Sequence, residues 1–201
     1  MRYKPLNQFA PLTVKVLFNY VLARIGLLDS KLGILTPKPE IHRKKVMLCV
    51  WWDMKGIIYY ELLEPKQTVT ANLYSQQLIR LSEALEKKRP FGGKGKRKVI
   101  LLHDNARPHV AKTTWATIEN LSWEVLSHPA YSPDLAPSDY HLFRSMEHFF
   151  REKSYTDLQS IKKDVTQFFE LKPEKFYESG IRQLPLRWQK VIDNDGNYFD
   201  D

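Results

Sequence analysis

The stretch VILLHDNARPHVA, residues 99–111, decides the fold. Its first four residues form a short apolar run, which is typical of a buried β-strand. Asp104 follows almost at once, in a cluster of polar side chains. Because an α/β sheet opens its ligand crevice where strands end, a carboxylate at this position can reach a bound metal. The local sequence also fits a turn in which Asp104 and Asn105 cap the helix that begins near His109.

The segments on either side alternate between strand and helix patterns. Apolar runs at 46–52 (VMLCVWW) and 57–62 (IIYYEL) flank a turn and predict a β-hairpin. Residues 70–88 show helical periodicity, with Thr70 as the N-cap. The further predicted elements are a helix at 110–121, a strand at 123–126, and helices at 137–150, 156–171 and 173–180. This order favours an α/β sheet with helices on its faces.

The bulk composition indicates one basic globular domain. The 201 residues include 31 Lys and Arg against 23 Asp and Glu, a formal charge of +8. This charge favours a polyanionic partner such as nucleic acid. The single cysteine, Cys49, lies in an apolar run, so we expect it in the core of a protein from a reducing compartment. Lys15, Asn19 and Arg24 interrupt the apolar stretch 12–28, so we expect no membrane span.

A second polar cluster lies in YSPDLAPSDYHLF, residues 131–143. Pro137 suits the first position of a helix, which places Asp139 in the first turn. The positive end of the helix dipole is then expected to keep Asp139 ionised. The alternative is that Asp139 only complements this dipole, and Asp134 is expected to serve only as a turn former.

Three segments carry a resemblance to a known family. They are WWDMKGIIYYELL (51–63), LLHDNARPHVA (101–111) and HPAYSPDLAPSDYHLF (128–143), followed by the ending LPLRWQKVIDNDGNYF (184–199). In this order they resemble the catalytic domain of mariner-family (Tc1/mariner) DNA transposases. The similarity runs from about residue 36 to the end. It divides the chain into a divergent segment, 1–35, and a partial catalytic domain, 36–201.

The resemblance implies a ribonuclease H-like (retroviral integrase-like) fold, a mixed central sheet with helices on both faces. Asp104 matches the second carboxylate of the family and Asp139 the third. The 34 residues between them fit the mariner subgroup whose third acid is Asp. The carboxylates of the family hold Mg²⁺ or Mn²⁺. Two such ions about 3.5–4 Å apart serve both ends of a phosphodiester displacement. We therefore expect Asp104 and Asp139 to face one another closely enough to share a divalent ion.

The first 35 residues depart from the family pattern. The first carboxylate of the family lies in a Gly-Asp-Glu segment on the first strand, whereas residues 1–35 contain only one acid, Asp29. We therefore expect the first strand to be missing or replaced, and metal to bind weakly or as one ion. Residues 1–28 are interpreted as an ordinary helix or a leader, although the apolar stretch 14–28 is a candidate to cover the exposed sheet edge. The helix-turn-helix region of the family is not found, so specific binding of transposon ends is not expected.

A basic, glycine-containing segment spans residues 87–98. It either tracks a phosphate backbone or acts as a nuclear import signal, and the alternative is a solvated loop between a helix and a strand. The predicted DNA-binding residues are Lys87, Lys88, Arg89, Lys94, Lys96, Arg97, Lys98 and Arg107.

Three functional hypotheses follow. The first is a transposase-derived DNA-binding protein that cleaves DNA poorly because its first catalytic Asp is lost. The second is a domesticated, non-catalytic DNA-binding or assembly module. The third is an active nuclease in which Asp29, Glu40 or Asp53 replaces the missing ligand. The expected partner is DNA, the expected location is the nucleus, and the resemblance suggests a homodimer.

Overall fold

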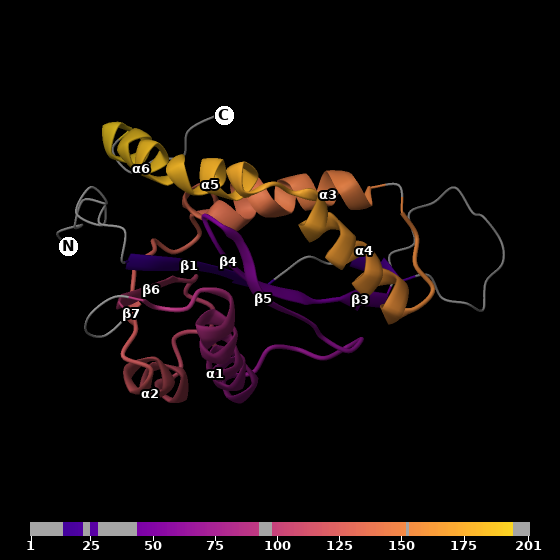
Figure 1. Cartoon of the computed structure of the whole chain (residues 1–201), viewed down its shortest axis with the longest axis horizontal. Coiled ribbons are helices and arrows are strands. Elements are labelled where there is room, and N and C mark those ends of the chain that lie inside the picture. Colours follow the sequence, from indigo (N-terminus) through magenta and orange to yellow (C-terminus); the bar gives the residue numbers. More distant parts are fainter. Residues whose placement is uncertain (1–13, 22–24, 28–43, 93–97, 152, 195–201) are drawn as a thin grey trace.

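The computed structural model describes residues 14–21, 25–27, 44–92, 98–151 and 153–194. Its centre is a mixed five-stranded sheet with the order β5-β4-β1-β6-β7 (Figure 1). The strands of this sheet are β1 (Val14–Val21), β4 (Leu48–Asp53), β5 (Gly56–Leu62), β6 (Lys98–Leu102) and β7 (Glu124–Val125). A separate two-stranded sheet joins β2 (Ile25–Leu27) to β3 (Lys44–Val46).

Strand β1 occupies the middle of the large sheet. It pairs antiparallel with β4, where Tyr20 lies opposite Val50, and parallel with β6, where Phe18 lies opposite Leu102. The prediction of a helix or leader is therefore wrong for residues 14–21. The apolar segment does not cover an edge either, because it lies between two other strands. Its sequence, VKVLFNYV, is rich in β-branched and aromatic residues, which suit a strand.

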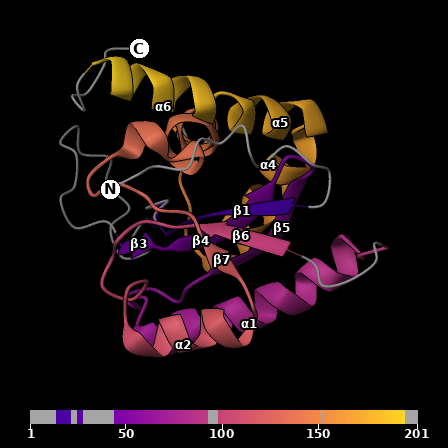
Figure 2. The ribbon, with the colours of Figure 1, turned by 90° about the vertical axis from the view of Figure 1, so that its left-hand side faces the viewer.

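Helices cover both faces of the sheet, which confirms the predicted fold class (Figure 2). One layer holds α1 (Ala71–Lys88) and α2 (Lys112–Asn120). The other holds η3 (Ser138–Phe143), α3 (Arg144–Phe150), α4 (Leu158–Leu171), α5 (Glu174–Arg182) and α6 (Leu184–Asp193), and a 3₁₀ turn, η2 (Pro133–Leu135), precedes η3. Helix α6 was not predicted. The Thr70 hydroxyl caps α1 by accepting a hydrogen bond from the Leu73 N–H, as predicted.

Alternating side chains of β4 divide the core into two parts. Leu48, Val50 and Trp52 pack under the layer of α3 to α6. Cys49 and Trp51 point to the opposite face and pack against α1 and α2. A strand that is buried on both faces has this continuous apolar pattern. Cys49 is fully buried, as predicted, and burial raises the pKa of its thiol to about 12.

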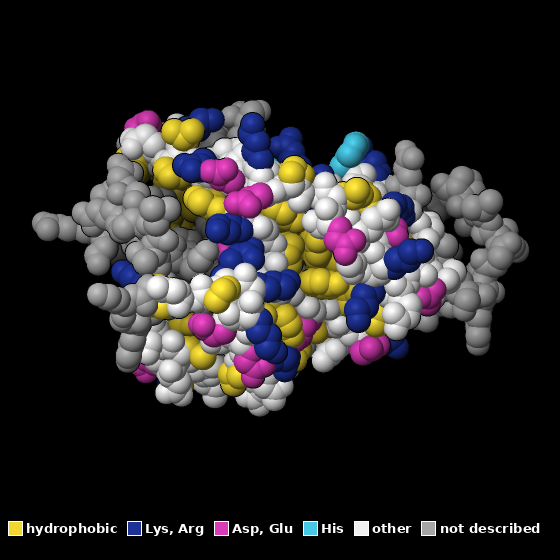
Figure 3. Space-filling model, in the orientation of Figure 1, with side chains coloured by type: hydrophobic (Ala, Val, Ile, Leu, Met, Phe, Trp, Pro, Cys, Tyr) yellow, Lys and Arg dark blue, Asp and Glu magenta, His cyan; other side chains and the backbone are white. Residues whose placement is uncertain are grey.

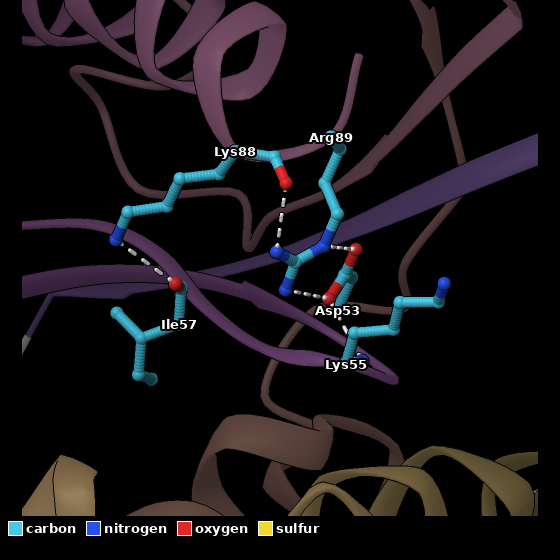
Figure 4. Close-up of polar contacts among 5 residues, drawn as sticks. All are labelled: Asp53, Lys55, Ile57, Lys88 and Arg89. Atoms are coloured by element: carbon cyan, nitrogen blue, oxygen red, sulfur yellow. Dashed lines mark hydrogen bonds and ion pairs between the residues drawn. The ribbon is translucent and has the colours of Figure 1, made fainter. Parts of the chain in front are cut away.

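An ion pair ties the end of α1 to the β4–β5 turn (Figure 4). The Arg89 guanidinium donates two hydrogen bonds of 3.1 Å, one to each carboxylate oxygen of Asp53. Asp53 also accepts from the Lys55 N–H at 2.8 Å, and Lys88 donates to the Ile57 carbonyl at 3.2 Å. The Asp53 side chain is only 5% exposed and that of Arg89 16%. Arg89 therefore serves the fold.

Replacing Arg89 with Met should lower the free energy of unfolding by about 3 kcal/mol, because it removes the guanidinium from a buried carboxylate. The double variant Asp53→Asn with Arg89→Met should lose less, since the buried charge is removed together with its partner. Urea unfolding of the single and double variants measures both effects. A loss below about 0.5 kcal/mol for Arg89→Met, typical of a surface pair, would contradict this structural role.

Candidate active site

Asp104 lies two residues beyond the end of β6, where the chain turns toward α2. Its Oδ1 accepts hydrogen bonds from the Ala106 N–H at 3.0 Å and from His109 Nδ1 at 2.5 Å. Both donors reach the same oxygen, so Oδ2 remains available to a ligand. Burial acts to raise the pKa of Asp104, but the hydrogen bonds from His109 and Ala106 outweigh it and hold this pKa below its usual value. Asp104 is therefore both a turn residue and an ionised carboxylate.

Asp139 lies at the second position of η3, a π-helix rather than the predicted α-helix. Its neighbour Ser138 is buried and accepts a hydrogen bond of 2.9 Å from Trp52 Nε1, which fixes the start of η3 against β4. π-helical turns are rare and often occur at functional sites. The Asp139 Oδ2 atom is buried and has no hydrogen-bond partner. An orphaned carboxylate oxygen of this kind is well suited to a bound cation.

The two carboxylates interact electrostatically. Burial, and to a smaller extent the negative charge of Asp104, together raise the pKa of Asp139 to about 7. The expectation that the helix dipole keeps Asp139 ionised is therefore wrong, because desolvation and the like charge outweigh the dipole of a six-residue helix. Oxygen ligands of this kind suit a hard divalent cation, whose charge would favour the ionised form of Asp139. Within the described residues, no group of three or more potential ligands is found.

The predicted basic residues differ in their surroundings. Lys94, Lys96 and Arg97 lie outside the described residues. Lys87 and Arg107 are exposed, and Lys98 pairs with Glu124 at 2.8 Å. Arg89 is held by Asp53, as described above, so it is not available to DNA in this structure. Arg107 lies three residues beyond Asp104, which makes it the described basic residue nearest to the site in sequence.

A mixed sheet of this order, with one carboxylate after a central strand and another at a helix start, defines a ribonuclease H-like domain. Residues 35–94 match the family model described as "Transposase (partial DDE domain)". The chain is 51% identical over 165 residues to the mariner Mos1 transposase of Drosophila mauritiana, and 42% identical over 164 residues to the Homo sapiens histone-lysine N-methyltransferase SETMAR.

Solved structures give the same result. A structure of the Mos1 transposase catalytic domain with raltegravir and Mg matches with a TM-score of 0.84 and 45% identity, over 97% of this chain and 90% of that one. The Mos1 paired-end complex with Mn matches with a TM-score of 0.82, over 94% of this chain and 57% of that one. The chain belongs to the mariner family of transposases. The sequence matches cover 48% of the Mos1 transposase and 24% of SETMAR.

The raised pKa of Asp139 predicts how the stability of the metal-free protein depends on pH. The folded pKa of about 7 lies above that of the unfolded chain, so stability falls as the pH rises from about 4 to about 7. Asp139→Asn should therefore stabilise the metal-free protein at pH 8 by about 1–2 kcal/mol, since partial solvent exposure reduces the full effect. The same substitution should change little at pH 4.

Urea unfolding in EDTA at both pH values measures this difference. The exposed Glu170→Gln on α4 is the matched control and should shift neither value. Equal stabilisation by Asp139→Asn at pH 4 and pH 8 would show that electrostatic strain at this carboxylate is not the cause.

Proposed function

We propose that this chain is a mariner transposase-derived DNA-binding protein whose metal-dependent DNA cleavage and strand transfer are impaired by loss of the first catalytic Asp. One observation carries the proposal. Strand β1, which lies between β4 and β6, reads VKVLFNYV and contains no Asp or Glu. Continuing its parallel register with β6 by two residues places Tyr20 level with Asp104. A central strand in this position is where the family carries its first acid.

In this proposal the two remaining carboxylates of the site, Asp104 and Asp139, bind a metal ion. Asp104 offers Oδ2 and Asp139 offers its unpartnered Oδ2 to one shared Mg²⁺ or Mn²⁺. In a complete site, two such ions supply an activated oxygen nucleophile and stabilise the leaving oxygen. With two carboxylates in place of three, the chain should hold the metal weakly or as one ion. Binding to DNA does not depend on these acids, because it depends on cationic side chains.

The proposed partner is DNA. The net charge is +8, and Figure 3 shows Lys and Arg side chains that run across both helical layers and the region between them, with Asp and Glu side chains among them. Because phosphate neutralisation supplies most nonspecific affinity, this distribution suits a nucleic acid backbone. A homodimer forms part of the same proposal, since the related Mos1 structures include a paired-end complex. A nuclear location is proposed because the proposed partner is DNA. No helix among the described residues is long and apolar enough to cross a membrane.

An active nuclease with a substitute acid receives no support from Asp53. This residue follows Trp52 on β4, and its carboxylate is held by Arg89 at the end of α1. Asp139 lies instead in η3, on the face of the sheet that α3 to α6 cover. The other two candidates, Asp29 and Glu40, lie outside the described residues. A non-catalytic DNA-binding module remains the second candidate function, and the acid-free β1 strand favours it equally.

The chain should show little or no Mg²⁺-dependent nicking of supercoiled plasmid. Losing one metal-bridging carboxylate removes about 4 kcal/mol of transition-state stabilisation, which lowers the rate nearly a thousandfold. The assay is run with Mg²⁺ or Mn²⁺ beside Asp104→Ala and Asp139→Ala. Robust nicking that both substitutions abolish would refute the impaired-site proposal and support a substitute ligand.

Neutralising Lys94, Lys96, Arg97 and Lys98 with Gln should weaken nonspecific DNA binding and make it less sensitive to salt. Each lost phosphate contact lowers the slope of log affinity against log salt by about 0.9, so we expect a decrease of about 2–4. Fluorescence anisotropy on duplex DNA at several salt concentrations measures the slope. The control carries Gln at four exposed lysines of α4, α5 and α6, namely Lys162, Lys163, Lys175 and Lys190. An equal decrease in the control would show that this basic segment has no special role in DNA binding.

A further inference from the structure

The carboxylate of Asp104 is oriented by His109, which lies five residues further along the same turn. His109 is 2% exposed, and its Nδ1 lies 2.5 Å from Asp104 Oδ1. An ionised carboxylate can only accept hydrogen bonds, so Nδ1 must carry the proton that is donated. The Ala106 N–H donates to the same oxygen. Together these two donors fix the rotation of the carboxylate and leave its Oδ2 for a cation.

The ring of His109 is itself held firmly. It stacks on His103 with 5.2 Å between the ring centroids and 8° between the ring planes. The ring centroid of Tyr74, from α1, lies 4.2 Å from that of His109. The Tyr74 hydroxyl forms a hydrogen bond of 3.0 Å with His103 Nδ1. Two aromatic neighbours therefore restrict the ring that donates to Asp104. Burial also lowers the pKa of His103 to about 3, so this neighbour is neutral.

A histidine in this turn could support the fold of the turn or orient the Asp104 carboxylate. The backbone of the turn has its own supports. The His109 N–H donates to the Ala106 carbonyl at 2.8 Å, and the Thr114 hydroxyl donates to the Pro108 carbonyl at 2.6 Å. The turn therefore does not need the His109 side chain to close. What the side chain adds is its bond to Asp104.

We propose that His109 is a positioning residue, which holds Asp104 through its Nδ1–H so that Oδ2 can share a divalent ion with Asp139. The inference rests on the proposed metal site. Partners that orient a ligand side chain in this way typically contribute 10–100-fold to metal affinity. His109 would contribute in the same way to any activity that the metal supports.

Mn²⁺ titration of the full chain, followed by electron paramagnetic resonance, tests the proposal. His109→Leu removes the donor, whereas His109→Asn keeps an N–H at the atom that corresponds to Nδ1. We expect Mn²⁺ affinity to fall about tenfold or more in His109→Leu and to stay within about threefold of the parent in His109→Asn. Thr114→Val is the matched control, because it loosens the same turn but leaves the donor in place. Its affinity should equal that of the parent.

The outcomes distinguish this inference from the proposed function. If Asp104→Ala and Asp139→Ala leave Mn²⁺ binding unchanged, the proposed metal site is wrong and the inference falls with it. If both weaken binding but His109→Leu does not, the site stands and the positioning role is wrong. If Thr114→Val lowers Mn²⁺ affinity as much as His109→Leu does, His109 supports the fold of the turn and does not orient Asp104.

A second measurement does not require metal. ¹⁵N spectra of the full chain at pH 8 should show the His109 ring with its proton on Nδ1, whereas a free imidazole side chain favours Nε2. Asp104→Ala should shift the population toward Nε2–H, because the acceptor is lost. A ring that carries its proton on Nε2 in the parent chain would exclude the hydrogen bond on which the inference depends. This result would hold even if His109→Leu failed to fold.

Discussion

The pairing of β1 with two neighbours is the constraint on which the rest of the structure depends. The backbone of β1 pairs with β4 on one side and with β6 on the other. The β4–β5 hairpin and the parallel strands therefore form one sheet. Without it, two inner strands would present unpaired N–H and C=O groups, and buried groups of this kind destabilise a fold. The two helical layers each pack on a face of this sheet. The same strand also lies beside the chain segment that presents Asp104, which makes the site dependent on it.

The second carboxylate of the candidate site is positioned by contacts between distant parts of the chain. Trp52 holds the start of η3, and the Tyr140 hydroxyl donates to the Gly180 carbonyl of α5 at 2.8 Å. His141 contacts the same helix, and a side chain at Gly180 would collide with its ring. The π-helix is therefore enclosed between β4 and α5. Asp139 is buried as a consequence, and its raised pKa follows from that burial and from the charge of Asp104.

Local sequence patterns predicted the parts of the fold that local forces determine. The β4–β5 hairpin, the Thr70 cap and the position of Asp104 after a buried strand all came from short apolar runs and turn residues. The central position of β1 could not be predicted in this way, because an apolar stretch broken by Lys15 and Asn19 fits a helix as well as a strand. Only the pairing of this segment with β4 and β6 shows that it is a strand. The pairing of Arg89 with Asp53 joins residues 36 positions apart and leaves no local pattern. For the same reason, the π-helical conformation and raised pKa of Asp139 could not be predicted.

The central claim is that the middle strand of a transposase-type sheet has no acid beside Asp104. The most direct test is to supply one and measure Mn²⁺ binding to the full chain. The register places Tyr20 opposite Val50 and, by extension along β6, level with Asp104, whereas Asn19 lies one residue away and opposite Trp51. Tyr20→Asp should raise Mn²⁺ affinity about tenfold or more and should lose this gain when Asp104→Ala is added. Asn19→Asp should not raise Mn²⁺ affinity, because successive strand residues face opposite sides of the sheet. Equal Mn²⁺ affinity for the parent, Tyr20→Asp and Asn19→Asp chains would contradict the account.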